Sequence, residues 1–274
     1  MPFSYAHYVL LLFIPLVVIA FWPFYFSQLA ASPVAIHVHG VTASAWILLL
    51  VFQSWAIHNR RIGLHRAAGR ASFVLFPLFL VGGFLVLHSM AIGTAVATNP
   101  FVVAFGPGLG ALDLLAVSAF AGLYLGALRH RREVQLHARF MLATPLLLLS
   151  PVFARLINSH VPGLIITGPE QMHLFPYSVQ LANLVAVVVA LALYASAPRY
   201  GRPFLWVVAV VLAQSTAFQW LGALPGWRAS FVSLAALPVA APVLLGLGLG
   251  AFILWHGLSG GRPGTGRRAS VESV

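Results

Sequence analysis

Apolar residues fill the chain in long runs that are separated by short polar segments. About eight of these runs reach the roughly 20 apolar residues that a helix needs to cross a bilayer. They cover residues 7–28, 34–57, 69–92, 108–129, 137–159, 176–197, 203–223 and 232–257. The pattern predicts an all-α, polytopic integral membrane helix bundle with about eight transmembrane helices, folded as a single domain over residues 1–258.

The predicted domain has two parts, and a tail follows it. Residues 34–160 form a motif-bearing core, whereas residues 176–257 add spans that contain few ionisable side chains. Residues 259–274, "SGGRPGTGRRASVESV", are rich in Gly, Ser and Arg. Such a composition cannot bury a core, so we expect a disordered cytoplasmic tail.

Prolines and glycines within the spans indicate helix kinks and close contacts between helices. Six prolines lie inside predicted spans: Pro15, Pro77, Pro145, Pro151, Pro238 and Pro242. In lipid such prolines indicate kinks or locally unwound turns rather than helix ends. The pairs Gly122/Gly126 and Gly246/Gly250 have the spacing that allows two helices to approach closely.

The composition agrees with a membrane environment and excludes several chemistries. Hydrophobic residues make up 61% of the chain and charged residues only 7%, against about 25% in soluble domains. Cysteine is absent, which excludes disulfides, iron–sulfur clusters, thiolate zinc sites and covalently attached c-type haem. Lysine is absent too, so the Schiff base of a retinal protein cannot form.

Arginine gathers in every second loop and gives the chain a net charge of +11. The opposite loops contain only Arg228. Because cytoplasmic loops retain positive charge, both termini are predicted on the cytoplasmic side of the membrane. Residues 57–70, "IHNRRIGLHRAAGR", are then an inner loop that faces anionic lipid headgroups. A nucleic-acid partner is not expected, because the arginines punctuate apolar runs instead of sharing one solvated face.

Histidines are expected in two layers near the two membrane faces. Counting outward from each hairpin turn gives an inner layer of His58, His65, His130 and His137, with His7 and His256 nearby. The outer layer contains His37, His39 and His88, with His160 and His173 on the adjoining segment. Membrane b-type cytochromes bind haem iron through such histidines on neighbouring helices. For each histidine alone, a hydrogen bond to water, lipid or a backbone carbonyl remains the alternative.

Asp113 is the only acidic residue inside a predicted span, and Arg155 lies at matching depth on the next span. A lone charge in a bilayer is costly, and an opposite charge largely removes that cost. The sequence therefore predicts a structural ion pair between Asp113 and Arg155. The alternative is that Arg155 contacts a ligand while Asp113 holds its guanidinium group.

Two stretches together resemble a known family. Residues 37–70, "HVHGVTASAWILLLVFQSWAIHNRRIGLHRAAGR", follow a pattern of histidine, tryptophan, glutamine near the helix end, and then His-Arg-x-x-Gly-Arg. Residues 128–156, "LRHRREVQLHARFMLATPLLLLSPVFARL", resemble a basic turn followed by His-x-x-Trp-Met-x-Arg and a later arginine. Both stretches resemble the uncharacterised bacterial multi-pass membrane family DUF2306, and this resemblance implies a location in a bacterial cytoplasmic (inner) membrane. The layout is also similar to that of the cytochrome b561-like membrane haem proteins.

The resemblance covers residues 34–160 and assigns the family pattern to particular positions. These positions are His39, Trp46, Gln53, His65, Arg66, Gly69, Arg70, His137, Met141 and Arg155. The chain departs from the pattern at Phe140, where tryptophan is usual, and at Thr144, near the usual second arginine.

Three functions remain open at this point. The first is a b-type haem protein for transmembrane electron transfer or redox sensing, an electron-transfer oxidoreductase if it is an enzyme, with a quinone or a redox protein as partner. It would use one haem as readily as two. The iron ligands would be His65 with His137 at the inner end and His39 with His88 at the outer end. The haem propionates would contact Arg66, Arg70 and Arg139. The second is a small-molecule transporter or binding bundle built on Asp113, Arg155, Gln53 and the outer histidines. The third is a non-catalytic membrane scaffold subunit. Hydrolase chemistry lacks a nucleophile–base set.

Overall fold

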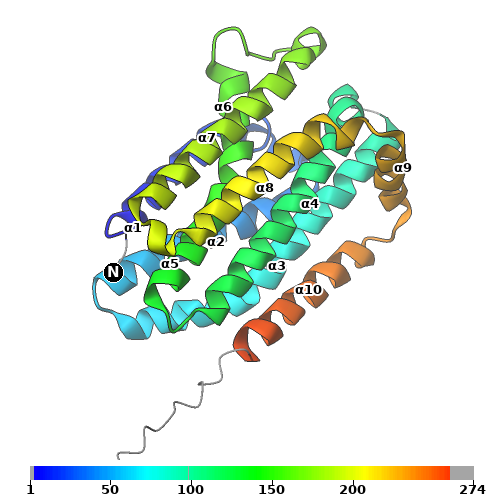
Figure 1. Cartoon of the computed structure of the whole chain (residues 1–274). Coiled ribbons are helices and arrows are strands. Elements are labelled where there is room, and N and C mark those ends of the chain that lie inside the picture. Colours follow the sequence, from blue (N-terminus) through cyan, green and yellow to red (C-terminus); the bar gives the residue numbers. More distant parts are fainter. Residues whose placement is uncertain (1–2, 98, 260–274) are drawn as a thin grey trace, which may run out of the picture.

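Helices are the only regular secondary structure of the described chain, residues 3–97 and 99–259 of a computed structural model (Figure 1). The α-helices are α1 (Ala6–Phe21), α2 (Val34–His58), α3 (Ile62–Val96), α4 (Pro100–Arg129), α5 (Val134–Ala143), α6 (Leu149–His160), α7 (Phe175–Ser196), α8 (Arg202–Gln219), α9 (Pro225–Ser233) and α10 (Ala240–Ser259). The longer helices lie roughly side by side in one bundle. The predicted tail from residue 260 onward lies outside the described residues.

The predicted all-α polytopic bundle is confirmed. Within the described residues, seven helical segments are long and apolar enough to cross a membrane. They are Val34–His58, Ile62–Val96, Pro100–Arg129, Val134–His160, Pro169–Ser196, Arg202–Ala223 and Ala240–Ser259. The first predicted span is instead a 16-residue apolar helix, α1. At 1.5 Å per residue it covers about 24 Å of a hydrocarbon core about 30 Å thick.

Two helices are longer than the sequence predicted. The prediction that residues 57–70 form a loop is wrong for most of the stretch. Only residues 59–61 lie between α2 and α3, so most of the basic stretch forms the first turns of α3. At the other end of the bundle, α4 begins at Pro100 rather than near residue 108. Asn99 caps this helix by accepting hydrogen bonds from the amides of Phe101 and Val102. An asparagine followed by proline is a helix start as well as a turn signal.

Prolines break two of the predicted spans. In the fifth span, a 3₁₀ turn at Thr144–Leu148, with Pro145 in its first turn, separates α5 from α6. The prediction of a locally unwound turn is therefore right at this position. The eighth predicted span, 232–257, is wrong at its start, because α9 ends before Pro238 and α10 begins only at Ala240. Pro15 and Pro77, by contrast, lie inside continuous helices.

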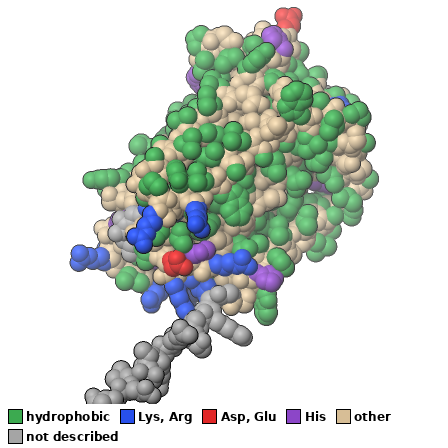
Figure 2. All heavy atoms as spheres, viewed as in Figure 1, with side chains coloured by type: hydrophobic (Ala, Val, Ile, Leu, Met, Phe, Trp, Pro, Cys, Tyr) green, Lys and Arg blue, Asp and Glu red, His purple; other side chains and the backbone are tan. Residues whose placement is uncertain are grey.

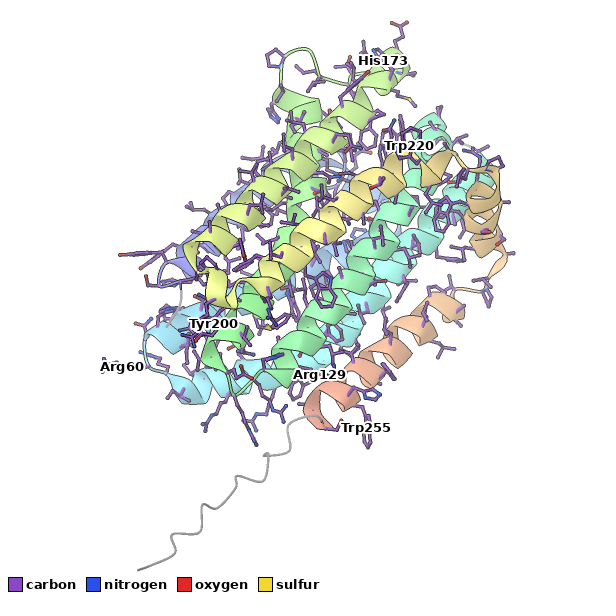
Figure 3. The ribbon with its side chains drawn as sticks, viewed as in Figure 1. Arg60, Arg129, His173, Tyr200, Trp220 and Trp255 are labelled. Atoms are coloured by element: carbon purple, nitrogen blue, oxygen red, sulfur yellow. The ribbon has the colours of Figure 1, made fainter. Side chains whose placement is uncertain are left out.

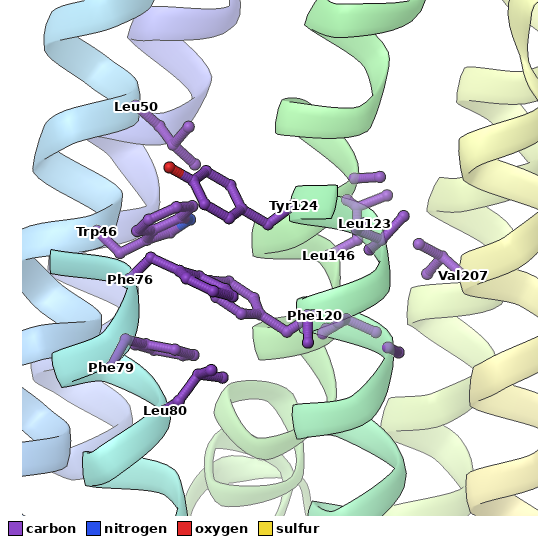
Figure 4. Close-up of a cluster of buried hydrophobic side chains, with 14 of the residues drawn as sticks. Trp46, Leu50, Phe76, Phe79, Leu80, Phe120, Leu123, Tyr124, Leu146 and Val207 are labelled. Carbon is purple, nitrogen blue, oxygen red and sulfur yellow. The ribbon is translucent and has the colours of Figure 1, made fainter. Parts of the chain in front are cut away.

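An aromatic layer forms the centre of the bundle (Figure 4). Trp46 of α2 is fully buried and packs its ring 5.0 Å from that of Phe120 and 5.3 Å from that of Tyr124, both on α4. Phe76 and Phe79 of α3 complete the layer. We call these five residues the aromatic barrier, because they fill the space between the two ends of the bundle.

The polar atoms of the aromatic barrier are satisfied. The indole of Trp46 donates a hydrogen bond of 3.0 Å to the hydroxyl of Thr144, at the 3₁₀ turn of the broken span. The hydroxyl groups of Tyr124 and Ser72 lie 2.6 Å apart and share a hydrogen bond. Because these hydrogen bonds connect α2, α3, α4 and the broken span, the barrier also fixes how the helices are arranged.

Glycines allow α10 to lie against α3, as the Gly246/Gly250 spacing predicted. A Cβ atom on Gly246 would lie 2.6 Å from the backbone nitrogen of Val81, and one on Gly250 would lie 2.6 Å from the Cβ atom of Pro77. Gly122 and Gly126 act differently, because each leaves room for an aromatic ring. Gly122 accommodates the ring of Trp206, and Gly126 accommodates that of Phe140. The C-terminal end of α10 is held by Arg131, which donates to the carbonyls of Gly257 and Leu258.

Arginine side chains gather at one end of the bundle (Figure 2). Arg60 and Arg129 lie at this end, whereas His173 and Trp220 lie at the other (Figure 3). Both ends of the described chain also lie at the arginine-rich end. We call this end the inner end and the opposite one the outer end. The names follow the prediction that arginine-rich loops stay in the cytoplasm.

Candidate functional site

Three ionisable side chains lie at about the same level in the outer half of the bundle. His39 lies two helical turns before Trp46 on α2, and Asp113 lies two turns before Phe120 on α4. Since both helices run from the outer to the inner end, the two residues share one level, about 10 Å outside the aromatic barrier.

Arg155 joins this level from α6. It lies eleven residues, close to three full turns, after Thr144, which hydrogen-bonds Trp46. Helical side chains lean toward the N-terminus of their helix, so the guanidinium group reaches back toward His39 and Asp113. We call His39, Asp113 and Arg155 the outer cluster.

The described contacts of the outer cluster leave polar atoms free. The ring of His39 lies 5.6 Å from that of Phe79, and its Nδ1 is buried without a hydrogen-bond partner. The guanidinium group of Arg155 lies 4.3 Å above the ring of Phe21, and one of its nitrogens donates to the carbonyl of Pro151. The carboxylate of Asp113 accepts no hydrogen bond from any described residue.

The predicted ion pair between Asp113 and Arg155 is not formed by direct contact among the described residues. Asp113 and Arg155 lie at about the same level of the bundle, but no described hydrogen bond joins their side chains. Helix α6 packs mainly against α7 and α1 rather than against α4. All three residues remain partly accessible. Asp113 lies more than three turns from the start of α4, whereas His39 and Arg155 lie less than two turns from the outer ends of α2 and α6. Opposite charges therefore lie at about one level without a hydrogen bond between them.

One residue of this region was missed by sequence reasoning. Asn158 lies one helical turn beyond Arg155 on α6 and is buried, and its side-chain oxygen has no hydrogen-bond partner. The available signal was its spacing, because residues three apart on a helix share a face. Asn158 adds an amide to the charged groups of the outer cluster.

A second group of polar residues lies on the inner side of the aromatic barrier. The rings of His65 on α3 and His137 on α5 have their centres 6.5 Å apart and their planes at 88°. His137 donates from Nδ1 to the carbonyl of Ala127, which leaves its Nε2 as an acceptor. Gln53 is buried with its side-chain oxygen unpartnered, and its amide nitrogen lies beside Gly69, one turn after His65. We call His65, His137 and Gln53 the inner cluster.

The predicted outer pair of haem ligands faces two different neighbours. His88 is buried, and its Nε2 donates to the carbonyl of Leu237, before α10. His39 instead contacts Phe79 and the part of α3 around Gly82. His65 and His88 lie 23 residues apart on α3, which corresponds to about 34 Å at 1.5 Å per residue. The inner and outer histidine layers are therefore far apart.

The three arginines predicted to contact propionates differ in their surroundings. Arg139 is almost completely buried, bonds the side chain of Gln135, and lies over the rings of Phe3 and Tyr200. Its position therefore suits a structural contact between α5 and the neighbouring segments. Arg66 and Arg70 are exposed at the start of α3.

The remaining histidines mostly bond nearby carbonyls, as expected for interfacial side chains. His130, His160 and His173 each donate to a backbone carbonyl three or four residues earlier. His37 hydrogen-bonds the hydroxyl of Tyr25. His7 and His58 pack against one another with ring centres 6.0 Å apart. His256 packs against Phe252.

Polar residues of the last spans connect helices. Asn183 of α7 donates to the hydroxyl of Ser215 on α8, and Gln180 donates to the backbone of the same residue. Gln214 of α8 is buried and donates to the carbonyl of Leu112 on α4. Hydrogen bonds of this kind stabilise helix association within lipid.

Comparison with known proteins finds no matching family model, no matching curated protein and no matching solved structure. The resemblance to DUF2306 and to cytochrome b561-like proteins therefore stays an expectation based on two stretches of sequence. Among the residues that the structure describes, no group of three or more His, Asp or Glu side chains could hold a metal ion.

Proposed function

We propose that the protein binds a small polar solute in the outer cluster and passes it across the membrane, and that this solute carries a negatively charged group such as a carboxylate. Arg155 would pair with the negative group of the solute. Asp113 would accept a hydrogen bond from an ammonium or hydroxyl group of the same molecule, and His39 and Asn158 would complete the contacts.

The observation that carries this proposal is that Asp113 and Arg155 lie at about one level inside the outer half of the bundle and that no described hydrogen bond joins them. Ionisable groups inside a membrane protein are costly unless they are paired or functional. A solute that bridges the two charges would supply the hydrogen bonds that each side chain lacks.

The broken fifth span supports transport rather than simple binding. Transporters often form their sites beside discontinuous helices, whose freed backbone groups border the substrate. Here the 3₁₀ turn Thr144–Leu148 lies at the aromatic barrier, through the hydrogen bond from Trp46. The barrier separates the outer cluster from the inner cluster, so movement of this turn would connect them.

Binding to purified protein tests the proposal. We expect Arg155→Gln to weaken binding about 10–100-fold, because a hydrogen bond to a charged group contributes about 1.5–3 kcal/mol. The measurement is the thermal midpoint in detergent with increasing concentrations of glycine betaine, proline, lactate and propionate, which cover zwitterions and simple carboxylates.

The matched control is Arg129→Gln, which removes the same charge from an exposed position at the end of α4. We expect this control to bind as the unchanged protein does. The proposal fails if none of the four compounds raises the midpoint, or if Arg155→Gln responds to them as fully as the control. A response to zwitterions that Asp113→Asn removes would show that both charges contact the solute.

A second candidate function, electron transfer through a single b-type haem at the inner cluster, is favoured by one distance. A metal–nitrogen bond of about 2 Å on each side of an ion puts two imidazole centres about 6 Å apart, close to the 6.5 Å between His65 and His137. The bond from His137 to Ala127 is also the kind that orients a metal-ligating histidine. The haem would supply reversible one-electron chemistry, with Arg66 and Arg70 available for its propionates.

An absorption spectrum separates this second candidate from the first. Haem-replete expression should give purified protein with a Soret band that shifts on reduction, and His137→Ala should remove the band. A spectrum without a Soret band would exclude haem under these conditions and would leave solute binding as the function to test.

A further inference from the structure

The turn between α2 and α3 contains a surface hollow of about 440 Å³ at the inner end of the bundle. Its walls are formed by Ile57 and His58 at the end of α2, by Arg60 in the turn, and by Ile62 at the start of α3. Two apolar walls beside a cation suit an amphiphilic ligand with a negative group. Neither the outer nor the inner cluster includes any of these residues.

A pair of histidines beside the hollow has unsatisfied ring nitrogens. His58 donates from Nδ1 to the carbonyl of Ser54, while its Nε2 is buried and has no partner. The ring of His7 lies 6.0 Å away, and its Nδ1 is also buried without a partner. Because Nδ1 of His58 donates, its Nε2 is an acceptor, so a ligand hydroxyl group that donates to Nε2 would complete the arrangement.

Arg60 has an unusual backbone conformation for its residue type. Its φ angle of 58° lies in the left-handed region, where glycine and asparagine are favoured. An arginine there is strained, and strain of this kind is concentrated at ligand sites. The neighbouring Arg61 is already engaged, because its guanidinium group lies 5.1 Å from the ring centre of Trp55. Arg60 is exposed at the inner end of the molecule (Figure 3) and carries the charge available to the hollow.

The position of the hollow indicates what kind of ligand it meets. It lies where α2, a helix long and apolar enough to span the membrane, reaches its C-terminal end. At this depth the phosphates of the inner leaflet lie beside the protein, and basic side chains there attract anionic lipids. An arginine guanidinium group donates to phosphate oxygens, and the acceptor nitrogen of a neutral imidazole can receive a hydrogen bond from a headgroup hydroxyl.

We propose that the hollow binds one anionic phospholipid, phosphatidylglycerol, with Arg60 donating to the phosphate, a headgroup hydroxyl donating to Nε2 of His58, and Ile57 and Ile62 contacting the glycerol and upper acyl region. The lipid would thereby stabilise the strained turn between α2 and α3. This proposal stands independently of solute binding in the outer cluster.

Native mass spectrometry of the full chain, released from nanodiscs of phosphatidylglycerol and phosphatidylcholine in equal amounts, tests the proposal. The unchanged protein should retain one phosphatidylglycerol in preference to phosphatidylcholine. Arg60→Gly removes the charge and suits the left-handed backbone, so the variant should fold. We expect it to reduce the retained phosphatidylglycerol about fivefold, as loss of one arginine near the headgroups implies.

The control is Arg129→Gln, which should retain as much phosphatidylglycerol as the unchanged protein. In lipid-free detergent, Arg60→Gly should melt no lower than the unchanged protein, because it relieves backbone strain. Equal retention by Arg60→Gly and the control would overturn the proposal, as would equal retention of the two lipids. Stabilisation of the unchanged protein by inorganic phosphate or glycerol phosphate at millimolar concentration, without preference for phosphatidylglycerol, would assign the hollow to a free phosphate and would also overturn it.

Discussion

Replacing Trp46 by alanine should lower the free energy of unfolding by about 3–5 kcal/mol, the usual cost of removing a large buried aromatic side chain. Trp46 is fully buried and contacts four other aromatic rings of the barrier. The substitution also removes the hydrogen bond to Thr144, whose hydroxyl then keeps only its bond to the carbonyl of Met141. The measurement is unfolding in increasing fractions of dodecyl sulfate, followed by helical circular dichroism.

Trp46→Phe separates the packing contribution from the hydrogen bond. This variant keeps most of the aromatic volume, so it should lose only about 1–3 kcal/mol, the cost of an unmade buried hydrogen bond. Thr144→Val should cost a similar amount, and the double variant should cost less than the sum of the two. If Trp46→Ala were no more harmful than Trp46→Phe, the aromatic barrier would not be the centre of the fold.

Gly246→Leu should destabilise the protein by about 3 kcal/mol, because its side chain would collide with the backbone of α3. A Cβ atom at Gly246 already lies 2.6 Å from the nitrogen of Val81 and 2.7 Å from its Cα atom. Backbone atoms cannot rotate away as a flexible side chain can, so α10 must move off α3. The same unfolding experiment measures the effect.

Gly248 provides a matched control in the same helix. A Cβ atom there would meet no heavy atom within 4 Å, and the residue is exposed. Gly248→Leu should therefore change stability by no more than about 0.5 kcal/mol. Equal losses for the two leucine variants would mean that the cost comes from the helix itself and not from contact with α3.

Much of the fold could be predicted from hydropathy, because apolar runs of spanning length have few alternatives in a chain with so little charge. Local turn chemistry was harder to interpret. Asn99 and Pro100 signal both a turn and a helix start, and the choice depends on whether apolar residues before residue 108 can pack. Arg66 and Arg70 suggested a loop, yet arginine is a good helix former and α3 continues through them.

The candidate site could be predicted only in part. Counting along antiparallel helices placed Asp113 and Arg155 at one depth, since rise per residue is constant in every helix. Counting gives no lateral distance, however, and α6 lies against α7 and α1 instead of α4. For the same reason the count grouped His39 with His88, although they face different neighbours. Lateral position depends on packing between segments far apart in the chain.

The proposed solute binding requires that the outer cluster be reachable from the outer end of the bundle and be closed from the inner end by the aromatic barrier. The absence of native cysteine makes a direct measurement simple. Single-cysteine variants in sealed vesicles are treated from either side with a membrane-impermeant thiol reagent, with Val34→Cys and Asn59→Cys, both at exposed positions, marking the outer and inner ends. Our account predicts that Asp113→Cys reacts from the side that modifies Val34→Cys and not from the side that modifies Asn59→Cys. An Asp113→Cys variant that reacts from neither side, or only from the side of Asn59→Cys, would contradict it.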